Sequence, residues 1–265
     1  MRNSRPFDPL ELAYETERIV TREGDGLERR YTGFYSTPVY RGAATGYAVG
    51  CCLRCIYCWS NWSRDFPERF GRFFSPKEAA ERLLMVAREG ITRWRGLGHL
   101  KIQRLRLSGC EPTIGRKHLL GVLRYVKDSG YLFIILLGSD REYVRELGEF
   151  KEGLYVRVSF KAATPEGFTQ RTGAVGEYYE LPFKALEYLV DKGIYARAAA
   201  MTDPRVMPEE ERRLLIKRLD EIDPDENYPE TLEEERIDLY DTSKARLKAF
   251  FDADFARRLE RAICS

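Results

Sequence analysis

The chain has 265 residues, of which 43% are hydrophobic and 32% charged, and its 44 basic residues nearly balance 42 acidic ones. This composition predicts a folded protein and excludes a disordered chain, while a net charge of +2 makes nucleic-acid binding unexpected. The sequence holds no run of about 18 apolar residues, so we expect no membrane span. Six cysteines and the absence of an apolar signal segment favour a cytoplasmic protein with reduced thiols.

The first part of the chain is predicted to be an N-terminal extension covering residues 1–42. It contains an amphipathic helix at about 9–20 and a polar stretch at 21–30. A strand is expected at 43–49, ending directly at Gly50-Cys51-Cys52. The first cysteine therefore follows the first strand of the main domain.

After a helix over 75–89, strands and helices are expected to alternate. That helix begins at Ser75-Pro76-Lys77-Glu78, where Ser75 can cap it and Glu78 can complete a capping box. Short apolar runs bounded by glycine or polar turns are typical of buried parallel strands. The expected strands are 103–107, 131–137, 154–160, 195–201 and 237–240, and the helices that follow them are 116–127, 141–149, 181–191, 209–221 and 242–262.

Six strand–helix units predict an α/β fold with right-handed crossovers. Because six units are too few to close an eight-stranded barrel, we expect a partial (β/α)6 barrel. Its core covers residues 43–240, and residues 241–265 form a C-terminal helix.

Chemically useful side chains follow the carboxyl ends of these strands, which is where sites lie in parallel α/β folds. The cysteines follow the first strand, and residues 108–113 and 138–139 follow the next two. Ser159 and Lys161 end the fourth strand, while Arg197 and Asp203 lie on or after the fifth. We expect these groups to surround one mouth of the barrel.

Three cysteines, Cys51, Cys55 and Cys58, have the spacing C-x3-C-x2-C. Three thiolates complete a tetrahedral zinc site only with a fourth ligand, for which Cys264 or His99 are the candidates. Alternatively, they hold three irons of a [4Fe–4S] cluster and leave the fourth iron open. A second register, with Cys52 in place of Cys51, gives C-x2-C-x2-C.

The spacing, with Tyr57 just before the last cysteine, resembles the radical S-adenosylmethionine (SAM) superfamily. The resemblance favours Cys51 over Cys52 as the ligand. It implies a [4Fe–4S] cluster, SAM bound to the open iron, and cleavage of SAM to a 5′-deoxyadenosyl radical that abstracts hydrogen from a substrate. It also implies that Tyr57 lies beside the adenine and that an electron donor of the reduced flavodoxin or ferredoxin type is a partner.

The segment Ser108-Gly109-Cys110-Glu111-Pro112 resembles the family's Gly-Gly-Glu-Pro segment. The resemblance implies that Ser108, Gly109 and Glu111 bind the amino group of SAM. Only one glycine is present, which departs from the family pattern, and an ordinary strand-to-helix loop is the alternative.

Ser159-Phe160-Lys161, followed by Arg171-Thr172-Gly173, resembles the activases of glycyl-radical enzymes, with Ser159 in place of an aspartate. Lys161 can contact the carboxylate of SAM or a substrate oxyanion; a solvated lysine is the alternative. Arg197 lies within an apolar run and needs a partner, either an anionic cofactor group or an internal acid such as Asp203.

The sequence therefore predicts a radical SAM enzyme, activase-like in pattern, that acts on a protein glycyl residue, a peptide or a small molecule. The alternative is a binding module without catalysis, stabilised by zinc or an iron–sulfur cluster.

Overall fold

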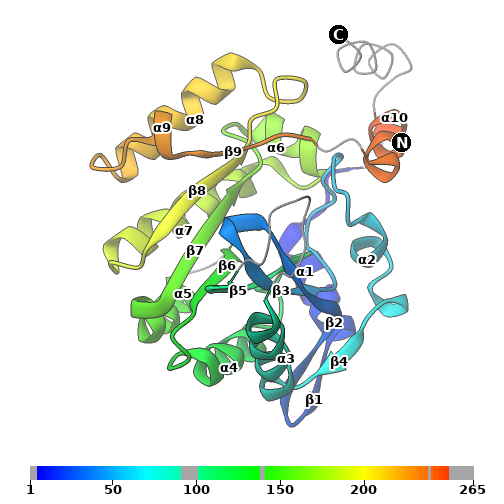
Figure 1. Ribbon diagram of the computed structural model, residues 1–265. Helices are drawn as coiled ribbons and strands as arrows, with labels where there is room; N and C mark the ends of the chain where they lie inside the picture. The colour runs from blue at the N-terminus through cyan, green and yellow to red at the C-terminus, as the bar shows by residue number, and fades with distance from the viewer. Residues whose placement is uncertain (1–4, 91–100, 138–140, 238–239, 251–265) are drawn as a thin grey trace.

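The computed structural model describes residues 5–90, 101–137, 141–237 and 240–250 (Figure 1). Its described strands form one sheet in the order β1-β2-β3-β5-β6-β7-β8-β9, with β4 paired to β2. The strands are β1 (Thr21–Gly24), β2 (Gly26–Thr37), β3 (Ala43–Ala48), β4 (Arg72–Phe74), β5 (Arg104–Gly109), β6 (Leu132–Leu137), β7 (Leu154–Phe160), β8 (Ala196–Met201) and β9 (Glu233–Glu235).

Six of these strands, β3 and β5 to β9, are parallel and lie in chain order. The strands at the two ends of the sheet, β1 and β9, pair with one neighbour each in the described part of the chain, so the sheet stays open. This confirms the expected α/β fold with a partial barrel.

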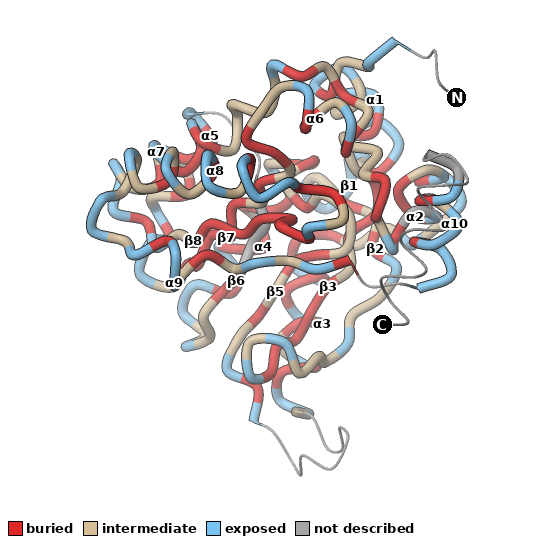
Figure 2. The backbone as a smooth tube through the Cα atoms, turned by 90° about the horizontal axis from the view of Figure 1, so that it is seen from above, coloured by how far each residue is buried: buried red, intermediate tan, exposed pale blue. Residues whose placement is uncertain are grey.

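Helices cover one face of the sheet, which we call the outer face (Figure 1). Side chains from α3, α4, α5, α7 and α8 form one apolar core with the outward side chains of the strands. Figure 2 shows the buried strands at the centre and exposed helix surfaces around them. The helices are α1 (Pro9–Val20), α2 (Asn61–Asp65), α3 (Pro76–Glu89), α4 (Arg116–Val126), α5 (Arg141–Leu147), α6 (Pro165–Thr172), α7 (Leu181–Asp191), α8 (Glu209–Ile222), α9 (Tyr228–Thr231) and α10 (Asp241–Phe250).

Helix α3 begins as its sequence predicts. The Ser75 hydroxyl accepts a hydrogen bond from the Glu78 N–H at 3.2 Å, and the Glu78 carboxylate accepts one from the Ser75 N–H at 2.8 Å. This reciprocal pairing satisfies backbone donors that have no partner within the helix, so it fixes where the helix starts.

Within the predicted extension at residues 1–42, the two strands β1 and β2 belong to the sheet. Strands β1 and β2 form an antiparallel hairpin, and β2 pairs antiparallel with β3. The polar stretch expected at 21–30 is therefore strand in the structure. The sequence does not show this strand by apolar alternation, because the fully buried Arg29 occupies a core-side position two residues before Tyr31.

The last strand was predicted at 237–240, but residues 237 and 240 are not strand and residues 238–239 lie outside the described chain. The strand is β9, three glutamates that pair with β8. An apolar run does not mark it because its side chains form ion pairs rather than a core. The predicted helix at 242–262 is observed as α10, and residues 251–262 lie outside the described chain, as do residues 138–139.

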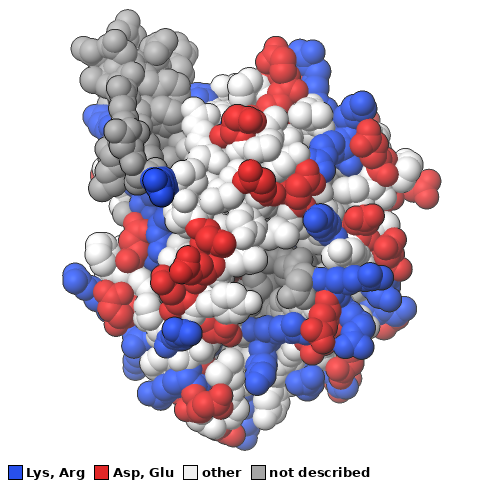
Figure 3. Space-filling model, turned by 180° about the vertical axis from the view of Figure 1, so that it is seen from behind, with Lys and Arg blue, Asp and Glu red and all other residues white. Residues whose placement is uncertain are grey.

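The molecular surface carries both signs of charge. Basic and acidic side chains lie next to one another over much of the face seen in Figure 3. Within the described ranges, no helix is long and apolar enough to cross a membrane.

Candidate active site

The cysteine loop follows β3 and is held by backbone hydrogen bonds at both ends. Gly50, with φ of +87°, donates its N–H to the Ser63 carbonyl at 3.2 Å. Further along, the N–H groups of Arg54 and Ile56 donate to carbonyls at the end of α6, at 3.1 and 2.9 Å. A side chain at Gly50 would collide with α1, because a Cβ there would lie 2.6 Å from Thr16. These contacts fix the backbone at both ends of the loop.

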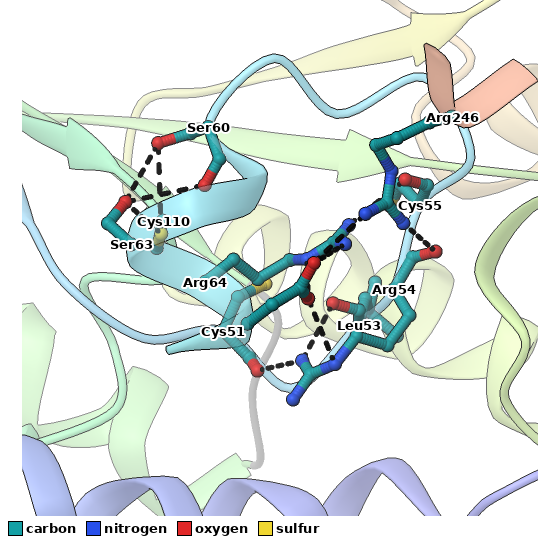
Figure 4. A network of polar contacts seen from close by, with 10 residues as sticks. Cys51, Leu53, Arg54, Cys55, Ser60, Ser63, Arg64, Cys110 and Arg246 are labelled. Carbon is teal, nitrogen blue, oxygen red and sulfur yellow. Dashed lines mark hydrogen bonds and ion pairs between the residues drawn. The ribbon is translucent and has the colours of Figure 1, made fainter. Parts of the chain in front are cut away.

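Three arginines surround the loop and share one carboxylate, that of Asp65 (Figure 4). Arg64 is almost fully buried, pairs with Asp65 at 2.7 Å and donates to the Cys55 carbonyl at 3.0 Å. Arg54 donates to the Cys51 carbonyl at 2.8 Å, and Arg246 from α10 reaches Asp65 at 3.0 Å. The net positive charge of these four side chains favours thiolates nearby.

The thiols differ in how readily they lose a proton. The hydrogen bond with Cys52, assisted by Arg64 and Arg54, lowers the pKa of Cys51 to about 6. Burial raises the pKa of Cys55 to about 11 and also raises the pKa of Cys58. Binding to iron supplies the positive charge that deprotonates such thiols.

The residues present fit a [4Fe–4S] cluster. Cys51, Cys55 and Cys58 are half-buried and free of disulfides, which leaves their sulfur atoms available. Among the described residues, no three Cys, His, Asp or Glu side chains converge as ligands of one metal ion. In a cluster each thiolate binds a different iron, so such convergence is not required. The zinc candidates Cys264 and His99 lie outside the described residues.

Cys52 packs against an apolar cluster formed by Val20, Val49 and Ile114, and its thiol also contacts that of Cys51 through a hydrogen bond. Both thiols therefore lie at the same point of the loop. The register with Cys51 as the ligand, and Cys52 as a small packed side chain, stays a prediction from the family resemblance.

The segment after β5 is joined to the cysteine loop. The Cys110 N–H donates to the Ala48 carbonyl at 3.1 Å, and the Glu111 N–H donates to the Gly50 carbonyl at 3.0 Å. Gly109 has φ of +93°, and a Cβ there would lie 2.8 Å from the Ala48 oxygen. The single glycine thus occupies a position where the backbones of β3 and β5 leave no room for a side chain.

Glu111 is the acidic group at this junction. Its carboxylate accepts hydrogen bonds from the N–H of Thr113 at 3.1 Å and from the Thr113 hydroxyl at 2.5 Å. Burial, together with the nearby Cys51, raises the pKa of Glu111 to about 7. The Glu111 carbonyl accepts a hydrogen bond from the buried Arg29 at 2.7 Å, a contact that no sequence pattern predicted.

The thiol of Cys110 is half-buried and lies close to the cysteine loop. It lies 3.4 Å from the Ser63 hydroxyl and 4.0 Å from that of Ser60 (Figure 4). Burial raises the pKa of Cys110 to about 12, so the thiol stays protonated and unreactive at neutral pH.

Lys161 lies just past the carboxyl end of β7. Its ammonium donates to the Ser159 hydroxyl at 2.5 Å and lies 3.6 Å from the Glu235 carboxylate. Burial would lower the pKa of Lys161, but the charges of Glu235 and Cys55 outweigh burial and the pKa is raised. Lys161 is therefore a held cation near the cysteine loop rather than a solvated lysine.

The buried Arg171 connects several segments at this edge of the sheet, a role that the sequence analysis did not predict. Arg171 on α6 donates from Nε to the Lys161 carbonyl and from Nη1 to the Val206 carbonyl, both at 2.6 Å, and pairs with Glu211. The backbone carbonyl of the same residue accepts from Ile56 in the cysteine loop. In the sequence, Arg171 was noted only as part of the segment Arg171-Thr172-Gly173 that resembles the activases.

Of two further predicted residues, one lies away from the cysteine loop and the other is buried beside it. Arg197 is near the amino end of β8 and forms the internal ion pair, with Glu226, so we leave it out of the SAM site. Tyr57 is buried against Met201, Ile237 and Leu247, which places its ring in a small core beneath the loop.

The chain is similar to a known protein family and to several solved structures. A family model described as the radical SAM superfamily matches residues 47–219. Among solved structures, the fold is similar to Streptococcus suis SuiB bound to S-adenosylmethionine, with a TM-score of 0.50 and 17% identity over 66% of this chain and 36% of SuiB. It is also similar to a radical SAM methyltransferase from Sphaerobacter thermophilus, with a TM-score of 0.52 and 12% identity over 75% of this chain and 62% of that one.

The chain thus spans little more than a third of the length of SuiB. No curated protein matches the sequence directly. The family model covers well over half of the chain and includes the cysteine loop, Glu111 and Lys161. The chain belongs to the radical SAM superfamily, whose cofactors are a [4Fe–4S] cluster and SAM.

Proposed function

We propose that this protein is a radical SAM enzyme that removes a hydrogen atom from a substrate bound on the inner face of the sheet, the face opposite the helices. The observation that carries the proposal is the junction of three segments at one edge. The cysteine loop, the Gly109–Glu111 turn and Lys161 come from three strand ends, and hydrogen bonds and charges connect them.

Each segment has a role in this proposal. Cys51, Cys55 and Cys58 would hold the cluster, and Glu111 with the backbone at Ser108-Gly109 would bind the amino group of SAM. Lys161, oriented by Ser159, would bind the SAM carboxylate as a point charge. When bound, the cluster and SAM together supply the 5′-deoxyadenosyl radical. Tyr57 stays a prediction for the adenine side of the site.

An electron donor of the flavodoxin or ferredoxin type would act from outside. Trp59, Trp62 and Phe66 follow the cysteine loop directly and are exposed. Exposed aromatic side chains of this kind are typical of protein-contact surfaces. Five described cysteines are free, and together with an oxygen-sensitive cofactor this favours a reducing compartment, the cytoplasm.

The finer proposal is an activase-like member. It is supported by Ser159, Lys161 and the Arg171-Thr172-Gly173 segment, whose backbone carbonyls anchor the cysteine loop. A protein glycyl residue, a peptide or a small molecule remains within this proposal as substrate; SuiB, a structural neighbour, is recorded with a precursor peptide.

Anaerobic reconstitution tests the proposal. The protein should bind about four irons and form 5′-deoxyadenosine from SAM after reduction. Cys55→Ala should lose the iron and the activity, whereas the matched variant Cys52→Ala should keep both. A colourless protein that holds one zinc would contradict the proposal, and iron loss in Cys52→Ala but not in Cys51→Ala would show that the other register is used.

A further inference from the structure

The inner face of the sheet carries a continuous polar network. Glu233 accepts from the Tyr40 hydroxyl at 3.2 Å and from Tyr155, and pairs with Arg157 at 2.6 Å. Arg157 also pairs with Glu235 at 2.9 Å, and Glu235 lies 3.6 Å from Lys161 at the proposed SAM edge. The network therefore runs from the loop before β3 to the carboxyl end of β7.

Tyr40 crosses this face from the loop before β3. Its backbone has φ of +53°, and Arg41 has φ of +59°, a conformation that is strained for side chains of this size. Arg104 holds the loop by donating to the Tyr40 carbonyl at 2.7 Å, and the Tyr40 ring lies 6.2 Å from that of Tyr155. The Tyr40 side chain thus spans the inner face toward β7 and β9.

Arg106 on β5 is the exception within this network. Its neighbours Leu105 and Leu107 are buried in the outer core, so Arg106 lies on the inner face, with its guanidinium 5.6 Å from the Tyr40 ring. No carboxylate pairs with it in the described ranges, and its buried Nε–H has no hydrogen-bond partner. Arg157, two strands away, has two carboxylates.

The charges on this face do not balance. Arg106, Arg157 and Lys161 contribute three positive charges, and Glu233 and Glu235 contribute two negative charges. Glu235 attracts Arg106 from a distance, but in the described ranges Arg106 is the one of these three cations that forms no ion pair. A half-buried cation without an ion-pair partner costs free energy, and such groups persist where a ligand supplies the counter-ion. The planar fork of arginine suits a carboxylate or a phosphate.

We propose that Arg106 binds the anionic group, a carboxylate or a phosphate, of the substrate of this enzyme. The proposal rests on the proposed function, and it narrows the substrate to an acid. Arg106 precedes Ser108 by two residues on the same face, a separation of about 7 Å along a strand. An acid held by Arg106 would thus present a nearby carbon to SAM at the strand end. Tyr47, on the neighbouring strand and in register with Ser108, lies on the same face of the sheet.

SAM itself carries a carboxylate, so it is the competing explanation. Lys161 lies at the edge beside Cys55 and already offers a cation there, whereas Arg106 lies deeper along the strand. The two explanations differ in what the loss of Arg106 does to SAM binding.

The test uses the reconstituted holoenzyme with SAM, titrated by calorimetry with acetate, succinate and inorganic phosphate. Succinamide, of similar shape but neutral, is the matched ligand control. We expect one anion to bind per chain, and Arg106→Gln to weaken it by about tenfold to a hundredfold, the range of a charge-assisted hydrogen-bonding pair. Arg106→Lys should retain part of the affinity, and Arg82→Gln on the exposed surface of α3 should retain all of it.

The outcomes separate cleanly. Binding of phosphate alone assigns a phosphorylated substrate, and binding of the carboxylates alone assigns a carboxylic acid. The proposal is overturned if no anion binds the wild-type holoenzyme, if Arg106→Gln binds as tightly as wild type, or if that variant loses SAM to the same extent. Iron content and 5′-deoxyadenosine formation, measured without anions on the same samples, report separately on the proposed function.

Discussion

The two faces of β7 differ although they belong to the same seven residues. Val156, Val158 and Phe160 point outward and are fully buried in the apolar core. Arg157 and Ser159 alternate with them and point inward, where they contact charged groups. The outer face therefore stabilises the fold through apolar burial. The inner face carries charged groups that the apolar core does not need.

The sharpest test of this division uses adjacent residues. Phe160→Ala removes a buried ring that packs 4.8 Å from Phe183 and should cost about 3–5 kcal/mol of unfolding free energy. Ser159→Ala removes only a hydroxyl and should cost under about 1.5 kcal/mol. Urea denaturation of the two variants measures this difference. Equal losses would mean that the inner face is part of the stabilising core.

The apolar outer layer also contains a buried polar pair, which tests whether apolar burial alone accounts for the stability of this layer. His118 on α4 is buried, with Nε2 2.9 Å from the Tyr31 hydroxyl and Nδ1 2.8 Å from the Leu27 carbonyl. Burial lowers the pKa of His118 to about 3. The folded protein therefore keeps this imidazole neutral, while the unfolded chain takes up a proton below pH of about 6.5.

Stability from His118 is consequently complete above about pH 6.5 and falls as the pH decreases toward 3. Between pH 7 and pH 4.5 the loss should be on the order of 2–3 kcal/mol. Urea denaturation at both pH values measures it, and His118→Gln should show a smaller decrease than wild type. The same decrease in both proteins would rule out His118 as the source.

Replacing Arg157 or Arg106, both on the inner face, should have different effects on the unfolding free energy. Arg157→Met leaves Glu233 and Glu235 without their shared cation and should lower the unfolding free energy by about 1–3 kcal/mol. Arg106→Met removes a half-buried charge that forms no ion pair in the described ranges, and should leave stability unchanged or raise it by up to about 1 kcal/mol. Thermal melting of the two variants compares them, and a loss in Arg106→Met as large as that in Arg157→Met would indicate a structural role for Arg106.

Sequence patterns predicted the parts of the molecule that local chemistry determines. The strand at Leu154–Phe160, the capping box at Ser75 and the cysteine spacing each depend on residues close together in the chain. The buried arginines Arg29 and Arg171 were missed, because their partners are backbone carbonyls of distant segments.

The same limit explains the errors at charged positions. Strand β9 is built of glutamates, and its pairing with Arg157 joins residues 76 positions apart. Arg197 was left with two candidate partners, a cofactor group or an internal acid, because its apolar neighbours showed that it needed a partner but not which one. Its acid, Glu226, is 29 residues away, and a single sequence does not show which charges meet.

Lys161 lies where the inner face meets the proposed SAM edge, so its removal tests whether a charge of the inner face contributes to SAM binding rather than to stability. Glu235 keeps Arg157 as a partner if Lys161 is removed, so Lys161→Met should change stability little. The lost cation should weaken SAM binding by about tenfold, the effect of one charge-assisted hydrogen bond. Equilibrium dialysis of SAM with the cluster-loaded protein measures this, and Lys184→Met on the exposed side of α7 is the control. Unchanged SAM affinity in Lys161→Met would assign the SAM carboxylate to another cation of the inner face. If that cation is Arg106, which forms no ion pair in the described ranges, the substrate acid would lose its proposed partner.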